Sequence, residues 1–341
     1  AIWAAMLDAE AGRATTERVG DRMNTGLAGV EALLDRLRTG DADIHRAGLA
    51  DLYRLDVNRP ILDAGDLPDG IRLPATSDLY VNHRARARRV AGHSPMATDG
   101  WWADAHAVDD LESVLAGYLT SREAVLAPLI VLGDPGSGKS LLTRMLAARL
   151  PASEFLPLRV ELRTVAADAP LQDQIESALY RTLGDRVTWP DLVRSAAGTL
   201  PVVMLDGFDE LLQASGINRA DYLEQVRDFQ RREADRDRPV VVLVTSRTVV
   251  ADRARVPEGC LVLRLQPFND DQVRCWLQVW TSTNHDGLAA RSLEPLTATA
   301  ALTYRELAEQ PLLLLLLALY DAGANVLQRS GGALSRAELY K

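Results

Sequence analysis

The residues best suited to chemistry lie in one short stretch, residues 132–140, which read LGDPGSGKS. The spacing G-x-x-x-x-G-K-S follows an apolar run and precedes a helical pattern, the order in which this motif has structural meaning. Glycines let backbone N–H groups approach a polyphosphate, and the start of a helix points its positive end at the same anion. We therefore predict a phosphate-binding loop, in which Lys139 contacts the β and γ phosphates of a nucleoside triphosphate and Ser140 binds Mg²⁺. The predicted nucleotide-contacting residues are Gly133, Asp134, Pro135, Gly136, Ser137, Gly138, Lys139, Ser140 and Leu141.

A second polar group follows the apolar run 201–205, which reads PVVML. Asp206 ends this run, where a carboxylate can hold Mg²⁺ beside the phosphates. Asp209 and Glu210 follow beyond a turn at Gly207, and either can orient or deprotonate a water that attacks the γ-phosphate. We predict Asp206 as a metal ligand and Asp209 and Glu210 as candidate catalytic residues. A strand that ends in a solvated acidic turn is the alternative.

A third polar group ends the apolar run 240–245, which continues into Ser246 and Arg247. A basic residue at this point would face the γ-phosphate, so Arg247 is a third candidate catalytic residue that reports whether that phosphate is present. A loop arginine paired with a local carboxylate is an equally supported interpretation.

Strand and helix patterns alternate around these groups. We expect strands at 128–132, 156–161, 201–206, 240–245 and 260–265, and helices near 139–149, 171–183, 190–197 and 221–234. Alternation with nearly continuous apolar strands predicts a five-stranded parallel sheet covered by helices on both faces, a three-layer α/β sandwich. The nucleotide should bind at the carboxyl edge of these strands.

The flanking sequence favours helices. Residues 1–74 predict an N-terminal helical segment and linker without chemistry, and residues 75–266 the nucleotide-binding domain. Residues 267–330 predict an all-helical subdomain. The chain begins without Met and stops inside a helical pattern within residues 331–341, so we expect a fragment of a longer protein.

Three local patterns precede the loop. Residues 79–81, Leu-Tyr-Val, could form a short strand. Residues 83–89, HRARARR, form a basic run; a solvated face is favoured over a contact with nucleic acid or an acidic partner. Trp101 and Trp102 should be partly buried at the start of an amphipathic helix that reaches Leu119.

Composition restricts the setting. The net charge of −9 in 341 residues argues against a general nucleic-acid binder. Cys260 and Cys275 lie in no metal-ligand spacing and predict core thiols in a reducing compartment. No secretory signal is visible, and the longest apolar run, residues 311–320, is about half of what a bilayer crossing needs. We expect a cytoplasmic protein without membrane contact.

Together these motifs resemble the NACHT branch of the STAND ATPases, which are NLR-like members of the AAA+-related P-loop NTPases. The phosphate loop resembles Walker A, and the DGFDE block resembles an extended Walker B. Residues 310–313, which read QPLL, resemble the proline motif of the helical domain, so the resemblance implies that Pro311 touches the base. The resemblance is carried by residues 133–140, 206–210, 245–247, 265–268 with Gln272 and Trp276, 310–313, and 334–340, which look like the start of a winged-helix domain.

The resemblance implies a signalling switch. ADP would hold a closed monomer, and ATP with Mg²⁺ would support a homo-oligomer with slow ATPase activity. The oligomer would activate an effector outside this chain after an unknown ligand, such as one derived from phage, is sensed. Bacterial antiphage defence is the expected setting, an innate-immunity role.

Other functions stay open. A STAND-type transcriptional regulator would keep the same core, and an AAA+-like ATPase or a P-loop kinase would turn over nucleotide faster. The phosphate loop does not distinguish ATP from GTP, because it contacts phosphates and not bases.

Overall fold

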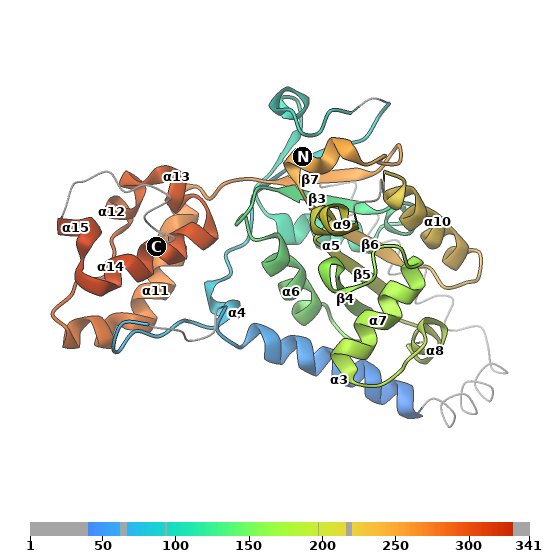
Figure 1. Cartoon of the computed structure of the whole chain (residues 1–341), viewed down its shortest axis with the longest axis horizontal. Helices are drawn as coiled ribbons and strands as arrows, with labels where there is room; N and C mark the ends of the chain where they lie inside the picture. Colours follow the sequence, from blue (N-terminus) through green and yellow to red (C-terminus); the bar gives the residue numbers. More distant parts are fainter. Residues whose placement is uncertain (1–39, 62–66, 93, 197, 216–219, 330–341) are drawn as a thin grey trace.

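The computed structural model describes residues 40–61, 67–92, 94–196, 198–215 and 220–329, which form two parts joined by extended segments (Figure 1). One part is built on a β-sheet, and the other contains helices α11 to α15. The predictions for residues 1–39 and 331–341 lie outside the described residues.

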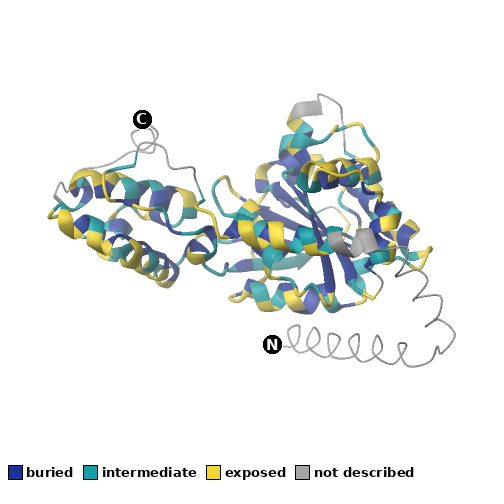
Figure 2. Ribbon diagram, turned by 90° about the horizontal axis from the view of Figure 1, so that it is seen from below, coloured by how far each residue is buried: buried dark blue, intermediate teal, exposed yellow. Residues whose placement is uncertain are grey.

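The sheet has seven strands in the order β2-β1-β7-β3-β6-β5-β4. Strands β3 and β5 are buried along their whole length, as expected for a sheet covered on both faces. Figure 2 shows the buried strands between helices whose outer faces are exposed. The strands are β1 Ala85–Arg89, β2 His106–Val108, β3 Leu129–Gly133, β4 Phe155–Glu161, β5 Leu200–Asp206, β6 Val241–Arg247 and β7 Leu261–Leu265.

The prediction of a five-stranded, all-parallel sheet is wrong. The five predicted strands do form one parallel group, β7, β3, β6, β5 and β4, with bounds within two residues of the expected ones. Strand β1 adds to β7 in the antiparallel direction, and β2 adds to β1. The sheet is therefore mixed, and the signal for its two extra strands was hidden because β1 is rich in arginine.

The basic run is not the solvated face that we predicted. Every residue of β1 is buried or half-buried, because the strand lies between two others. Its arginine side chains cross the loop that carries the tandem tryptophans: Arg86 donates to the carbonyl oxygen of Trp102 at 2.7 Å, and Arg88 donates to that of Trp101. The charged side chains of Arg86 and Arg88 thus hold the tryptophan loop against the sheet.

The predicted helices cover only some of the twelve helical segments described in the sheet part. Helices at 139–149 and 171–183 are as predicted, whereas the helix after Asp206 was missed. The segments are α3 Gly40–Val57, α4 Thr76–Leu79, η1 Asp99–Trp102, α5 Leu111–Thr120, η2 Glu123–Val125, α6 Lys139–Arg149, η3 Leu162–Thr164, α7 Leu171–Leu183, α8 Trp189–Ser195, α9 Phe208–Ser215, α10 Tyr222–Ala234 and η4 Thr248–Arg253.

Two local predictions need correction, and one is confirmed. Leu79 ends the short helix α4, and no described strand contains Tyr80 or Val81. The amphipathic helix starts at Leu111 and not at the tandem tryptophans, because the strand β2 intervenes. Trp102 is buried and donates Nε1–H to a backbone carbonyl, so the expected burial of this pair holds.

Helix α3 packs on the sheet part beside α6, α7 and the edge strand β4. Arg144 on α6 forms an ion pair with Asp56 at 2.7 Å. The backbone N–H of Arg159 donates to the Tyr53 hydroxyl at 3.0 Å, which satisfies a donor at the open edge of β4. The described end of the N-terminal segment is thereby fixed to the elements that carry the predicted site.

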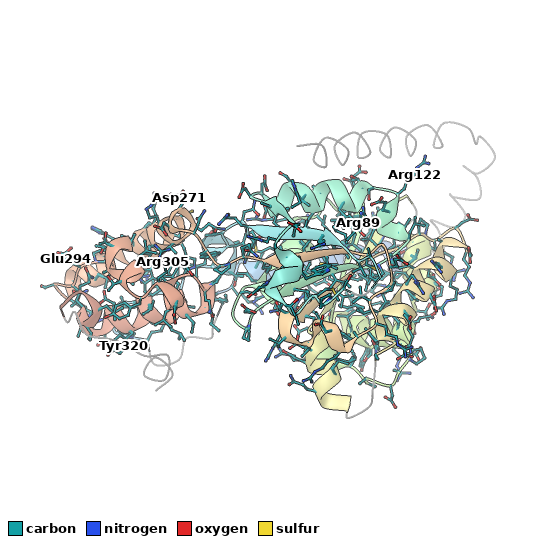
Figure 3. The ribbon with its side chains drawn as sticks, turned by 90° about the horizontal axis from the view of Figure 1, so that it is seen from above. Arg89, Arg122, Asp271, Glu294, Arg305 and Tyr320 are labelled. Carbon is teal, nitrogen blue, oxygen red and sulfur yellow. The ribbon has the colours of Figure 1, made fainter. Side chains whose placement is uncertain are left out.

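The helical part has its own hydrophobic core, which includes Trp276, Trp280 and Leu314. Its first helix begins with a capping box between Asn269 and Gln272. Figure 3 shows Asp271 and Arg305 in this part and Arg89 in the sheet part. The helices are α11 Asp270–Ala290, α12 Ala298–Thr303, α13 Arg305–Ala308, α14 Pro311–Ala324 and α15 Val326–Arg329.

The segment between α3 and β1 connects the two parts. The N–H of Arg72 donates to the side-chain oxygen of Asn284 at 2.7 Å. Gly70 also lies close against Gly287, because a Cβ added at Gly287 would lie 2.1 Å from the Gly70 carbonyl oxygen. Gln272 in turn donates to the Asn82 carbonyl at 2.7 Å. The helical part is therefore held by the described chain between α3 and β1, residues 58–61 and 67–84, which we call the strap.

Two sequence-level expectations about the setting can be compared with this structure. Cys260 is buried as predicted, but Cys275 is exposed on α11 and is not a core thiol. None of the helices in the described ranges has both the length and the apolar character that a bilayer crossing requires.

Candidate nucleotide site

The glycine-rich loop connects β3, which ends at Gly133, to α6, which begins at Lys139. Gly136 and Gly138 have φ of 79° and 93°, the left-handed region that favours glycine. A Cβ at Gly138 would also lie 2.6 Å from the His83 ring. The loop therefore needs glycine at these positions, and it presents the free N–H groups at the start of α6.

Lys139 is curled onto its own loop. Its Nζ donates to the carbonyl oxygens of Gly133 at 2.8 Å and Asp134 at 2.9 Å, which uses two of its three N–H groups. Burial lowers its pKa, against the attraction of Asp209 and Asp206. The Ser137 hydroxyl beside it is buried without a partner among the described residues. A partly buried ammonium and an unsatisfied hydroxyl in a loop of this shape fit an anionic ligand.

Asp206 ends β5 and is held by two donors. The Thr245 hydroxyl donates to its Oδ1 at 2.6 Å, and Arg159 donates to its Oδ2 at 2.7 Å. The hydroxyl of Thr245 accepts from the N–H of Gly207 at 2.9 Å, which fixes its direction. Strand β6 lies between β3 and β5, so Thr245 stands between the phosphate loop and this carboxylate.

The donor set fits Mg²⁺. Ser140 and Asp206 line the same cavity and offer a hydroxyl and a carboxylate, the hard oxygen ligands that this ion prefers. Such a site usually uses one or two protein oxygens and completes its shell with phosphate and water. No cluster of three or more His, Cys, Asp or Glu that could hold a metal ion occurs in the described ranges.

The other predicted acids differ from each other. Asp209 is buried and accepts from the Arg247 side chain at 2.8 Å and from its backbone N–H at 3.2 Å. Arg247 is thus paired with a local carboxylate, the alternative that the sequence left open. Glu210 is half-buried and lines the cavity next to Gly207.

These groups surround one cavity of about 290 Å³. Its polar wall comes from the phosphate loop and the ends of β5 and β6, and its apolar wall comes from the strap and the helical part. The polar wall is lined by Pro135, Gly136, Gly138, Lys139, Ser140, Leu141, Asp206, Gly207, Asp209, Glu210, Thr245 and Arg247. The apolar wall is lined by Ile61, Leu79, Val81, His83, Phe268, Trp276, Pro311, Leu312 and Leu315.

The structure brings nearly all predicted site residues together. Gly133, Asp134 and Ser137 belong to the loop but are not part of the cavity lining. Pro311 lies in the apolar wall at the first turn of α14, on the opposite side from the loop residues of the sheet part. Its contact with a base stays a prediction.

Sequence reasoning missed most of the apolar wall. Leu79 and Val81 were predicted to form a strand, and because this apolar triplet lies far from the phosphate loop in the sequence, no local signal indicates a ligand contact. His83 was counted with the basic run, yet it is buried and donates from Nε2 to the Ser137 carbonyl at 2.9 Å. Burial lowers its pKa to about 4, although the bond to Ser137 opposes this shift. His83 is thus a neutral support of the phosphate loop.

The fold and the site together define an α/β protein whose glycine-rich loop, lysine and strand-end aspartate have the arrangement of a P-loop nucleotide-binding domain. No family model matches the sequence, and a search of curated proteins finds no match. Among solved structures, the chain is similar to the ORC2 protein of Aeropyrum pernix, solved as ADPNP-ADP complexes, with 14% identity and a TM-score of 0.40. The match covers 67% of this chain and 64% of that one. Similarity this weak supports no argument about function, which depends here on the geometry of the site.

Proposed function

We propose that this chain binds ATP and ADP with Mg²⁺ in the cavity and hydrolyses ATP slowly, as a switch. The observation that carries the proposal is the cavity itself. It combines the phosphate loop, the strand-end Asp206 and an apolar wall contributed by a second part of the chain. A polyphosphate on the loop and a base against the apolar wall would occupy both sides at once.

The polar residues take distinct roles in this proposal. Lys139 would turn its free N–H toward the β and γ phosphates, and Ser140 and Asp206 would hold the Mg²⁺, which supplies neutralisation of phosphate charge. Both oxygens of Asp209 are engaged by Arg247, so Glu210 is the better candidate to orient the attacking water. Asp209 then keeps Arg247 at the strand end, where it would respond to the γ-phosphate.

The apolar wall suits a flat, apolar ring. Leu79 and Val81 from the strap and Pro311 and Leu312 from α14 contribute to it. A Cβ added at Gly136 would lie 3.4 Å from Leu312, so the loop and α14 lie close together. A bound nucleotide would therefore touch both parts of the protein, which is what a switch requires, since a ligand shifts only the arrangement that it contacts differently.

The cellular role in the proposal depends on the resemblance of the motifs to NACHT-type STAND proteins. In that role the ATP-bound form assembles into a homo-oligomer and activates an effector in antiphage defence. A STAND-type transcriptional regulator or an AAA+-like turnover ATPase would use the same cavity, and the experiment below separates turnover from switching.

The test uses the fact that the chain has two lysines, Lys139 and Lys341. Purified protein is denatured, and the released nucleotide is identified by chromatography, beside Lys139→Ala and the matched control Lys341→Ala. The proposal expects ADP in the wild type and in the control and none in Lys139→Ala. Fast steady-state turnover from an initially empty site would reject the switch in favour of a turnover enzyme. Release of GDP in place of ADP would keep the switch but change the bound base from adenine to guanine.

A further inference from the structure

A largely buried arginine lies behind the two predicted Mg²⁺ ligands. Arg159 is on β4, an edge strand of the sheet, and only 13% of its side chain is exposed. It does not line the nucleotide cavity. No motif in the sequence marks it, and the function proposed above gives it no role.

The guanidinium of Arg159 connects three elements. Its Nε donates to the Thr143 hydroxyl on α6 at 3.0 Å, and its Nη1 donates to Glu161 on β4 at 2.6 Å. Its Nη2 donates to Asp206 on β5 at 2.7 Å. A planar fork of fixed geometry thus joins the helix that carries one predicted metal ligand to the strand that carries the other.

The contact with α6 lies directly behind Ser140. Thr143 is three residues further along the helix, and its hydroxyl donates to the Ser140 carbonyl oxygen at 3.0 Å. On the other side, Asp206 accepts one hydrogen bond on each oxygen, from Arg159 and from Thr245. A carboxylate has about four acceptor positions, so each oxygen keeps one for a metal or its water.

The position of Arg159 is itself fixed. Its backbone N–H donates to the Tyr53 hydroxyl of α3, and Glu161 supplies a second negative charge to the buried cluster. Arg163 also reaches Glu161, at 3.2 Å, but is 65% exposed. The cluster of one guanidinium and two carboxylates keeps a formal charge of −1, which still attracts a cation.

We propose that Arg159 is a positioning residue for the metal: it sets the separation between the Ser140 hydroxyl and the Asp206 carboxylate, so that the cavity prefers Mg²⁺–nucleotide over free nucleotide. This inference depends on the proposed nucleotide function. Partners in the outer shell of a metal site commonly change metal affinity about 10- to 100-fold when they are removed.

The test measures the ratio of nucleotide affinities with Mg²⁺ and with EDTA, using a fluorescent ADP analogue. Arg159→Lys keeps the charge but offers its N–H groups from a single nitrogen in place of a planar fork, and Thr143→Val removes one acceptor without changing charge. Arg163→Met is the matched control, because it removes a neighbouring arginine that also contacts Glu161. Binding of Mn²⁺ to the nucleotide complex, followed by electron paramagnetic resonance, gives a readout that is independent of activity.

We expect the ratio to fall about tenfold in Arg159→Lys and about threefold in Thr143→Val, with affinity in EDTA nearly unchanged. The Mn²⁺ affinity should fall by the same factors, because the coupling is reciprocal, and Arg163→Met should match the wild type. A wild-type ratio in Arg159→Lys would show that charge alone matters. Equal losses with and without metal would show a purely structural role. Either result overturns the inference while leaving the proposed nucleotide function standing, because the wild type still binds nucleotide.

Two further outcomes keep the proposals separate. A wild-type protein that binds no nucleotide under either condition overturns the proposed function and this inference together. If Arg159→Lys does not fold, Thr143→Val decides: an unchanged ratio in that variant overturns the positioning role.

Discussion

His83 should make the stability of the protein depend on pH in a range where few other groups titrate. The residue is 1% exposed, and its Nε2 donates to the Ser137 carbonyl of the phosphate loop. Its Nδ1 is buried without a partner among the described residues. Protonation would place a positive charge on that nitrogen with no acceptor, and this burial lowers the pKa of His83 to about 4.

The direction and the magnitude of this change in stability with pH follow from the linkage between proton binding and folding. The unfolded chain, with an ordinary histidine pKa of about 6.5, binds a proton that the folded chain excludes between about pH 6.5 and 4. Stability is therefore full above this range and falls as the pH drops through it. The difference in pKa corresponds to about 3 kcal/mol, of which about 2 kcal/mol is lost between pH 8 and pH 5.

The perturbation is His83→Gln, which keeps an N–H donor near the Ser137 carbonyl but does not titrate. Free energies of unfolding are measured in urea at pH 5, 6, 7 and 8, and the wild type should lose about 2 kcal/mol more than the variant over this range. His285→Gln is the control, since that side chain is 68% exposed. Parallel pH profiles for wild type and His83→Gln would refute the reasoning.

Other predictions concern the strap and the water-orienting acid. Gly287→Ala should destabilise the protein by about 1–3 kcal/mol, because its Cβ would lie 2.1 Å from the Gly70 carbonyl oxygen. Gly323→Ala, also in a helix but with open space around it, should be neutral or stabilise by up to about 1 kcal/mol; thermal unfolding of both variants checks this contrast. Glu210→Gln should lower single-turnover ATP hydrolysis by about 100-fold or more while Mg²⁺–nucleotide affinity is kept, and equal hydrolysis in the variant would exclude Glu210 as the water-orienting residue.

The polar half of the site could be predicted because its signals are local. The loop around Lys139 and the strand before Asp206 are continuous segments in which residue type and order determine the structure. Apolar strands of this kind can be found from sequence since they are buried on both faces. Strand β1 could not, because Arg86 and Arg88 gain their partners only from a separate loop.

The remaining features of the site depend on contacts between distant segments. Asp209 and Arg247 form their ion pair across 38 positions, so their pairing was one of two equal interpretations. Arg159 meets Asp206 across 47 positions, and neither neighbour in β4 hints at it. The apolar wall requires the strap and α14 to face each other. Sequence periodicity describes each segment alone and contains no information about contacts between distant segments.

The position of the cavity between the two parts restricts how a switch can operate. The strap contacts at Gly70 and Asn284 hold the helical part in place, and a nucleotide must favour one arrangement over another to change it. Moving such an equilibrium from 1:99 to 99:1 requires about 5.5 kcal/mol of differential binding. Hydrogen bonds to charged groups are worth about 1.5–3 kcal/mol each, so two to four contacts made only by a γ-phosphate would be enough. Lys139 and Arg247 both line the cavity and are suited to make such contacts, which is why the difference between ATP and ADP can be sufficient for the proposed switch.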